Sequence, residues 1–323
     1  MLTKELRNNL EEAYHDGDII IFNGKDIEYS TGDVNRYTFM RSSAKPVQLI
    51  ATLIHNLDIK FGLNDAEIAV MTASHRAEKC HIEALNSIIE KTKLNEEEMI
   101  VKPTYPLGED SYIEALKNND KRKIYHNCSG KHLNLMLLQR YLTGSTHGYE
   151  LSTSESFQEI MTNMKYLLNT DDIKLGTDGC GVPVFYVKLL DIAKLYYHLA
   201  NPETIKDESI KKAVIKINNA VHKYPFNIAG KNRICSLLNH DPEIFAKGGA
   251  KGTYAFGMKN PNLGIAIKVL DGSEEPWGII CKEIVKRYKI TSKSLPLLEN
   301  TFKSEIYNDN GIEIGNHITC FKF

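Results

Sequence analysis

A serine three residues before a lysine is the arrangement in this chain that most directly indicates catalysis. Ser42 and Lys45 lie in the run Arg41-Ser-Ser-Ala-Lys-Pro-Val-Gln48, where a helix is expected to begin. Residues at i and i+3 share one face of a helix, so the hydroxyl and the amine can approach each other. A serine hydroxyl is a poor nucleophile until a base takes its proton, and a lysine whose pKa is lowered by burial can be that base. The pair therefore indicates a serine–lysine hydrolase.

A second match to the same spacing shows how much depends on the surroundings of the motif. Ser209-Ile-Lys-Lys212 lies in a lysine-rich stretch that we interpret as a solvated helix. The first match is followed by the apolar run Leu49-Ile-Ala-Thr-Leu-Ile54, which would bury the helix and desolvate Lys45. We therefore take Ser42 and Lys45 as the catalytic candidates, with an exposed polar pair as the alternative interpretation of either match.

Two further segments offer a hydroxyl and an amine. Thr72-Ala-Ser-His75 stands at an expected strand-to-helix junction, where Ser74 could supply a second hydroxyl or simply cap the following helix. Lys247 lies in Ala246-Lys-Gly-Gly-Ala-Lys-Gly252, at the start of an expected hairpin. Glycines on a strand let its backbone come close to a ligand while the amine reaches over it. A surface hairpin with glycines that serve only the turn is the alternative.

Two cysteines stand out because both lie in glycine-containing turns. Cys128 lies in His126-Asn-Cys-Ser-Gly-Lys-His132, and Cys180 lies in Thr177-Asp-Gly-Cys-Gly-Val-Pro183. Cysteine and histidine favour zinc-like metals, whereas lysine is a rare ligand because it must first lose its proton. Neither segment has a zinc-finger spacing, so two unrelated thiols remain the alternative to a metal site.

Composition limits the classes of partner. The 40 lysines and arginines balance the 41 acidic residues, which gives no electrostatic reason to expect nucleic acid or an anionic membrane surface. No apolar run approaches the ~18 residues of a membrane span, and the charged N-terminal stretch is unlike a signal peptide. The six cysteines include no C-x-x-C pair, which is typical of free thiols in a reducing compartment. These features predict a cytoplasmic protein.

The pattern of apolar segments predicts an α+β fold in one domain over residues 1–323, because no repeat, low-complexity tract or linker interrupts the chain. Strands near both ends would form an antiparallel sheet, with a helical layer against it. The expected elements are a hairpin over 17–29 turning at Asn23-Gly24, a short strand or buried segment over 67–72, helices over 78–93, 157–168, 207–222 and 276–288, and strands over 244–247, 253–258 and 263–270.

Five of these segments together resemble the class 3 L-asparaginases, usually called the asparaginase II family. The matching motifs keep the family's order and are Arg41-Ser-Ser-Ala-Lys-Pro46, Ala73-Ser-His75, Asn127-Cys-Ser-Gly-Lys-His132, Asp178-Gly-Cys-Gly-Val-Pro183 and Lys247-Gly-Gly-Ala250. The resemblance implies a serine-hydrolase fold like that of penicillin-binding proteins, β-lactamases and the serine-dependent glutaminases.

Carried over by position, the resemblance implies the catalytic residues. Ser42 and Lys45 take the place of the family's first serine–lysine pair, and Ser74 and Lys247 that of the second. Arg41 corresponds to the arginine that precedes the nucleophile, and it is assigned to substrate binding.

The resemblance also implies the binding residues. Asp178 corresponds to the carboxylate that holds the α-ammonium group of the substrate, and His75 is assigned to the same binding site. Cys128, Lys131 and Cys180 correspond to a zinc site beside the active centre. Zinc would support substrate binding without being essential to the chemistry.

The chain departs from the family pattern outside these residues. Ala77 stands where the family has glycine in Ser74-His-Arg-Ala-Glu78, Lys251 stands where glutamate is common, and Leu133-Asn134 replaces small residues. The resemblance implies hydrolysis of L-asparagine to L-aspartate and ammonia by a homodimer.

The alternatives are of two kinds. The first is a glutaminase or another hydrolase of the same fold with the S-x-x-K motif, acting on a different amide. The second is a non-enzymatic zinc- or redox-responsive protein built around Cys128 and Cys180.

Overall fold

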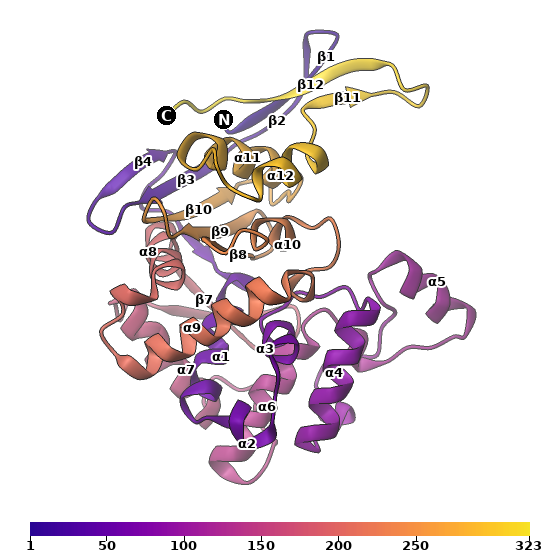
Figure 1. Cartoon of the computed structure of the whole chain (residues 1–323), viewed down its shortest axis with the longest axis vertical. Coiled ribbons are helices and arrows are strands. Elements are labelled where there is room, and N and C mark those ends of the chain that lie inside the picture. The colour runs from indigo at the N-terminus through magenta and orange to yellow at the C-terminus, as the bar shows by residue number, and fades with distance from the viewer. The chain divides into compact units, whose positions relative to one another are not determined.

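The computed structural model describes all 323 residues and divides the chain into two compact units, each built from separate stretches of sequence (Figure 1). Unit 1 comprises Met1–Ser43, Val187–Asn201 and Leu237–Phe323, and unit 2 comprises Ala44–Tyr186 and Pro202–Ser236. The expectation of a single domain over 1–323 stays a prediction. No helix of the structure combines the length and the apolar character that crossing a membrane requires.

Unit 1 contains a five-stranded antiparallel sheet in the order β4-β3-β10-β9-β8. Its strands are β3 (Gly17–Phe22), β4 (Ile27–Thr31), β8 (Ile244–Gly248), β9 (Thr253–Met258) and β10 (Leu263–Val269). The helices against it are α8 (Leu189–Ala200), α11 (Trp277–Tyr288) and α12 (Leu295–Thr301). Figure 1 shows α8 on one side of this sheet and α11 with α12 on the other. The predicted antiparallel sheet with strands from both ends of the chain is confirmed.

The sheet forms where the sequence has apolar runs separated by turn residues. Strands β3, β8, β9 and β10 are almost wholly buried. In β3 this burial agrees with the continuous apolar run Ile19–Ile21, which is typical of a strand covered on both faces. The predicted hairpin between β3 and β4 is confirmed, and the Asn23 side chain stabilises its turn by accepting hydrogen bonds from the amides of Lys25 and Asp26. These contacts fix the register of the N-terminal strands.

A second sheet of unit 1 was not expected from the sequence. It has the order β11-β12-β1-β2 and pairs the two ends of the chain. Its strands are β1 (Thr3–Arg7), β2 (Leu10–His15), β11 (Glu305–Tyr307) and β12 (Glu313–Thr319), and the short strand β5 (Tyr37–Phe39) completes the unit. These strands are largely polar and partly exposed, so the apolar pattern that reveals a buried strand is weak here.

Unit 2 is predominantly helical. Its helices are α1 (Lys45–Ile54), α2 (Leu57–Phe61), α3 (Asp65–Met71), α4 (Lys79–Thr92), α5 (Glu109–Lys117), α6 (Ser129–Thr143), α7 (Glu155–Leu168) and α9 (Glu208–Lys223), with the hairpin β6 (Lys174–Thr177) and β7 (Pro183–Lys188). The short helix α10 (Ile234–Leu238) contains the sequence boundary between unit 2, which ends at Ser236, and the last stretch of unit 1, which begins at Leu237. The apolar helix α1 packs on α6, α7 and α9, and this cluster forms the core of the unit. The predicted helices over 78–93, 157–168 and 207–222 correspond to α4, α7 and α9 and are confirmed.

One predicted element of unit 2 needs correction. The segment 67–72 is buried as expected, but it belongs to helix α3 and is not a strand. Asn64 caps this helix by accepting a hydrogen bond from the Glu67 amide, while the Glu67 carboxylate accepts one from the Asn64 amide. This reciprocal capping box starts a helix and outweighs the short apolar run that follows it. Residues 72–78 therefore connect two helices.

Helix α6 starts close to the end of α3 because of a glycine. A β-carbon at Gly130 would lie 2.2 Å from the carbonyl oxygen of Val70, which is too close for any side chain. The first turn of α6 carries Ser129 and Lys131 and can approach α3 only because residue 130 lacks a side chain.

We expect Gly130→Ala to lower the free energy of unfolding by about 1–3 kcal/mol, because the new methyl group forces the two helices apart. Urea denaturation of the variant beside Lys212→Ala, an exposed substitution on α9, measures this loss. Equal stability of both variants would contradict the close approach.

Candidate active site

The amine of Lys45 is buried at the start of helix α1 in unit 2. The residue is only 1% exposed, and its Nζ lies 2.5 Å from the Ala73 carbonyl oxygen, 3.4 Å from that of Asn127 and 3.2 Å from Ser74 Oγ. Burial lowers the pKa of Lys45, and the charge of Lys131 lowers it further, although Cys128 opposes the shift. A lysine with a lowered pKa can give and take a proton near neutral pH. The structure therefore places a buried amine with a lowered pKa within hydrogen-bonding distance of the Ser74 hydroxyl.

The segment that carries Ser74 is held by backbone contacts. The amide of Ser74 donates to the Ile228 carbonyl at 3.0 Å. The alternative that Ser74 or His75 caps the next helix is wrong, because α4 begins after Glu78. Glu78 and His81 cap that helix reciprocally. The hydroxyl of Ser74 is thus left to face Lys45.

His75 occupies the interior of unit 2 with both ring nitrogens engaged. Its Nδ1 accepts a hydrogen bond from the Ala77 amide, so Nε2 carries the proton and donates to Ser129 Oγ at 2.8 Å. Burial lowers the pKa of His75 well below its usual value, which keeps the ring neutral. In this arrangement His75 ties the Ser74 segment to the first turn of α6. Its assignment to substrate binding stays a prediction.

The two glycine-turn cysteines come together with Lys131 and Asp178. Lys131 Nζ lies 2.9 Å from Cys180 Sγ and 3.4 Å from Asp178 Oδ2, and none of these side chains is exposed to more than a small extent. Both thiols are free and buried. The structure thus brings the two thiols together, and the metal site stays a prediction. The predicted loop and turn that carry them are the start of α6 and the tight turn between β6 and β7.

Contacts within this cluster shift the pKa values of both cysteines and of Lys131. A hydrogen bond from Cys180 lowers the pKa of the Cys128 thiol well below its usual value, with help from the charges of Lys45 and Lys131, while burial opposes the shift. The same hydrogen bond and burial raise the pKa of Cys180. Burial would lower the pKa of Lys131, but Cys128, Cys180 and Asp178 together raise it. The cluster thus favours a Cys128 thiolate beside a Lys131 ammonium.

Unit 1 carries Ser42 and Lys247. Ser42 is 8% exposed and lies in a 3-10 helix, Arg41–Ala44, that leads into α1. Lys247 is buried on β8, where its amine donates to the Gly248 carbonyl at 2.7 Å. Both segments meet at the buried Tyr196 of α8, whose hydroxyl lies 2.8 Å from the Ser43 carbonyl oxygen and 3.2 Å from that of Lys247. Tyr196 therefore fixes the Ser42 segment against β8.

The backbone around Ser42 has an uncommon conformation. Arg41 has a φ of +51°, in the left-handed region that few residues other than glycine occupy. The glycine turn after Lys247 approaches the same segment, because a β-carbon at Gly249 would lie 2.7 Å from the Met40 carbonyl oxygen. The expected approach of this turn to a ligand stays a prediction. Strained backbone of this kind is frequent at functional sites.

The family of the chain follows from its match to known sequences. The family model described as L-asparaginase II matches residues 3–319. The chain belongs to this family. It is therefore an amidohydrolase, which excludes the non-enzymatic alternative. No curated protein matches the chain.

Solved structures similar to this L-asparaginase II family member are distant. A probable glutaminase from Bacillus subtilis complexed with 6-diazo-5-oxo-L-norleucine is 14% identical, with a TM-score of 0.39 over 84% of each chain. A β-lactamase from Mycobacterium bovis is 12% identical, with a TM-score of 0.44 over 84% of this chain and 94% of the other. At these levels of similarity the assignment depends on the family match and on the site itself.

Two residues that depart from the family pattern have left-handed backbone conformations in the structure. Ala77, which replaces the family's glycine, has a φ of +53°, and Lys251, which replaces its glutamate, also has a φ of +53°. The left-handed conformation explains why glycine suits position 77, because it costs other L-residues roughly 1–2 kcal/mol. The chain keeps this conformation with alanine, so the departure preserves the backbone path between Ser74 and α4.

Buried histidines in unit 2 give a prediction about pH. Burial lowers the pKa of His81 to about 4, although hydrogen bonds with Phe226 and Glu78 oppose the shift. The unfolded chain binds a proton at His81 below about pH 6.5 and the folded chain does not until about pH 4. Stability from this residue is therefore complete above pH 6.5 and is lost as the pH falls to about 4, by about 3 kcal/mol.

We expect the free energy of unfolding of the native chain, measured with urea, to fall more steeply between pH 6.5 and 4 than that of His81→Gln. The matched control His147→Gln changes an exposed histidine and should keep the native slope. Equal slopes for all three proteins would show that His81 titrates normally.

Proposed function

We propose that the protein is an L-asparaginase that hydrolyses L-asparagine to L-aspartate and ammonia. The observation that carries the proposal is the buried amine of Lys45, 3.2 Å from the hydroxyl of Ser74, in a chain of the L-asparaginase II family. A buried lysine that contacts a serine supplies the proton transfer that hydrolysis of an unactivated amide needs.

In the proposed first step, the Ser42 hydroxyl attacks the carbon of the side-chain amide while Lys45 takes its proton. The support is their spacing across the join between the 3-10 helix and α1, and the lowered pKa of Lys45. The tetrahedral oxyanion would accept hydrogen bonds from backbone amides near Ser42. Arg41 is proposed to bind the substrate beside them.

In the proposed second step, the amide nitrogen leaves as ammonia and water then hydrolyses the acyl-enzyme. Ser74 would pass the proton held by Lys45 to the leaving nitrogen, because its hydroxyl is within hydrogen-bonding distance of Lys45 Nζ. Lys247 is proposed to assist Ser74 when water attacks. This part rests on the family motif around Lys247 and on its burial on β8.

Asp178 is proposed to bind the α-ammonium group of the substrate. Its carboxylate side chain is 8% exposed and already lies 3.4 Å from the Lys131 ammonium, so the position suits a positive charge. A carboxylate that binds the substrate ammonium favours free amino-acid amides over amides that lack the amine.

The cluster of Cys128, Lys131 and Cys180 fits a zinc ion in the chemistry of its donors. Two buried thiols, one with a strongly lowered pKa, are soft ligands, and the Lys131 amine lies 2.9 Å from Cys180 Sγ. Lys131 would have to lose its proton first, which its raised pKa opposes. When bound, zinc would supply a fixed positive charge that favours the substrate carboxylate.

We expect one zinc ion per chain to depend on Cys128, and its removal to raise the KM for asparagine while turnover at saturating substrate persists. Elemental analysis of Cys128→Ser against the native protein, both purified without chelator, measures this. The partly buried Cys80 offers the control Cys80→Ser, which should keep the native metal content. Equal metal content in Cys128→Ser and the native protein would make these cysteines structural.

Ammonia release from a panel of amides tests the proposed function. The panel contains L-asparagine, L-glutamine, D-asparagine and succinamic acid. We expect L-asparagine to have the highest kcat/KM. Faster hydrolysis of L-glutamine would assign the chain as a glutaminase. The homodimer stays a prediction, which sedimentation of the purified protein would check.

A further inference from the structure

The second sheet of unit 1 gathers acidic and imidazole side chains on one face. In its register Thr3 pairs with His15 across β1 and β2, and Glu5 pairs with His317 across β1 and β12. Residues directly opposite in neighbouring strands share a face, as do Thr3 and Glu5, which are two positions apart. Four polar side chains from three strands therefore point the same way.

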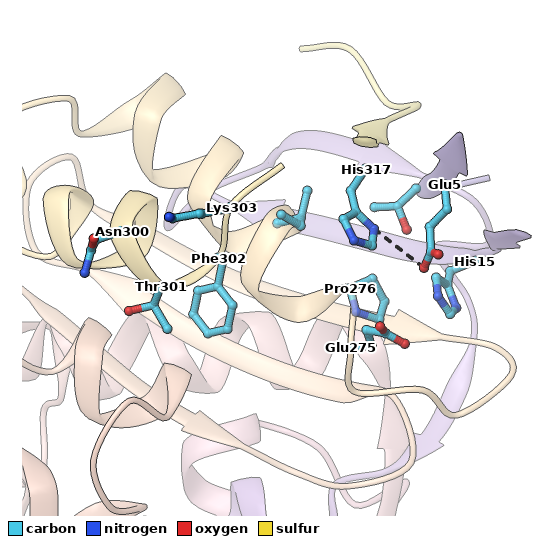
Figure 2. A pocket seen from close by; sticks show the side chains of 11 residues that line it. Glu5, His15, Glu275, Pro276, Asn300, Thr301, Phe302, Lys303 and His317 are labelled. Atoms are coloured by element: carbon cyan, nitrogen blue, oxygen red, sulfur yellow. Dashed lines mark ion pairs between the residues drawn. The ribbon is translucent and has the colours of Figure 1, made fainter. Parts of the chain in front are cut away.

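A carboxylate from another element joins them. Glu275 lies just before helix α11, and one side-chain ligand atom each of Glu5, His15 and Glu275 lie within 4.8 Å of one another. His317 Nδ1 lies 3.5 Å from Glu5 Oε1, as Figure 2 shows with a dashed line. The cluster thus offers two imidazoles and two carboxylates.

These side chains line a cavity of about 340 Å³. Figure 2 shows Glu5, His15, Glu275 and His317 grouped at one end of it, away from Asn300 and Thr301. Thr3 lines the same cavity, and although it is only 3% exposed its hydroxyl has no hydrogen-bond partner. A buried hydroxyl without a partner costs free energy unless a bound ion or its water satisfies it.

The ring of His15 is already oriented for ligation. Its Nδ1 lies 2.6 Å from Asp271 Oδ2, so in the neutral ring this nitrogen carries the proton and Nε2 has the lone pair. Metal-binding histidines usually donate their other ring nitrogen to a carboxylate in this way. Asp271 does not line the cavity, so its contact serves the orientation of His15.

We propose that Glu5, His15 and Glu275, with His317 as a fourth ligand, bind a divalent transition-metal cation of which zinc is the representative. Mixed imidazole and carboxylate donors suit such ions better than calcium or magnesium, which prefer oxygen ligands alone. The site goes beyond the proposed function and lies entirely within unit 1. It would link the first strands of the chain to the turn before α11 and to the last strand.

Two geometric points support this choice. Ligands about 2.1 Å from a tetrahedral ion are roughly 3.4 Å apart, and these ligand atoms lie within 4.8 Å of one another. The side chains therefore need to approach by at most about 1.4 Å, which the partly exposed Glu5 and the exposed Glu275 can do. A comparable cluster of Glu78, Cys80 and His81 in unit 2 cannot bind a metal in this way. There both ring nitrogens of His81 are engaged, by the Glu78 amide and the Phe226 carbonyl.

The test is a titration of the metal-free full chain with Zn²⁺ and, separately, with Co²⁺. The variants are Glu275→Gln and His15→Ala, and the matched control is Glu274→Gln, which makes the same change at an exposed neighbour outside the cavity. Cobalt bound by nitrogen and oxygen gives ligand-field absorption without the thiolate charge-transfer band that Cys128 and Cys180 would produce. This difference separates the new site from the cysteine cluster.

We expect Glu275→Gln and His15→Ala each to weaken binding at this site at least about tenfold, with any thiolate band unchanged, while Glu274→Gln keeps the native affinity. Zinc should also raise the unfolding temperature of the native chain more than that of either variant. Equal affinities in Glu275→Gln and Glu274→Gln would overturn the proposal, even if His15→Ala failed to fold. Cobalt spectra with thiolate ligation alone would overturn it as well.

Discussion

Replacing Lys45 with methionine is expected to reduce kcat for amide hydrolysis by at least about a thousandfold. In the proposed mechanism the buried amine of Lys45, in contact with Ser74, is the base, and methionine fills its space without being able to carry a proton. Because burying an ammonium group is unfavourable, Lys45→Met should fold at least as stably as the native chain. Loss of turnover without loss of stability is therefore the result that identifies a catalytic role.

The partner of Lys45 in this loss is Ser42. Ser42→Ala should be as inactive as Lys45→Met, and the double variant should be little worse than either, because residues that act as one unit are strongly non-additive. Ser209→Ala is the matched control, since Ser209 has the same spacing to Lys212 but is exposed and hydrogen bonded to Asp207. Substantial turnover by either single variant would rule out the pair.

A covalent probe distinguishes the two serines. An asparagine analogue with an electrophilic diazoketone in place of the amide should label the nucleophile, and peptide mass spectrometry would locate the label. We expect the label on Ser42 and none in Ser42→Ala. A label on Ser74 instead would mean that the contact between Lys45 and Ser74 belongs to the nucleophile, which would reverse the proposed roles of the two hydroxyls.

The sequence predicted the buried sheet and the long helices because each has a local signal. Strands β3, β9 and β10 are apolar runs bounded by turns, and helices α4, α7 and α9 repeat apolar residues at helical spacing. The mistaken strand over 67–72 is a short apolar run, for which strand and helix cannot be told apart by pattern alone. The capping box of Asn64 and Glu67 was the signal that would have settled it.

The missed elements depend on contacts between distant parts of the sequence. Strands β1 and β12 are polar and pair across almost the whole chain, so no local pattern marks them. The register of these strands also creates the cluster of Glu5, His15 and His317, which no sequence spacing could reveal.

The same reasoning applies to the active site. The spacing of Ser42 and Lys45 was visible in the sequence, but the contact of Lys45 with Ser74, 29 residues away, was not. Tyr196 was missed because it looks like an ordinary core aromatic of an amphipathic helix. Only the fold shows that its hydroxyl meets the Ser43 and Lys247 carbonyls.

Replacing Asp178 with asparagine is expected to raise the KM for L-asparagine by about a hundredfold, with a smaller change in kcat, because an amide cannot neutralise the substrate ammonium. Asp178→Asn also removes an ion-pair partner of Lys131, and this loss would alter the binding of any metal held by the neighbouring thiols. The KM alone therefore cannot assign the role. The ratio of kcat/KM for L-asparagine to that for succinamic acid can, because effects through Lys131 act on both substrates.

In the native enzyme this ratio should strongly favour L-asparagine, and in Asp178→Asn it should fall toward one. Asp171→Asn is the matched control, since Asp171 is an exposed carboxylate of the same segment that pairs with Lys165. Its ratio should stay at the native value. If native enzyme hydrolysed succinamic acid as well as L-asparagine, or if Asp178→Asn kept the native ratio, Asp178 would not bind the amine. Its carboxylate would then serve to hold the Lys131 ammonium beside the two thiols.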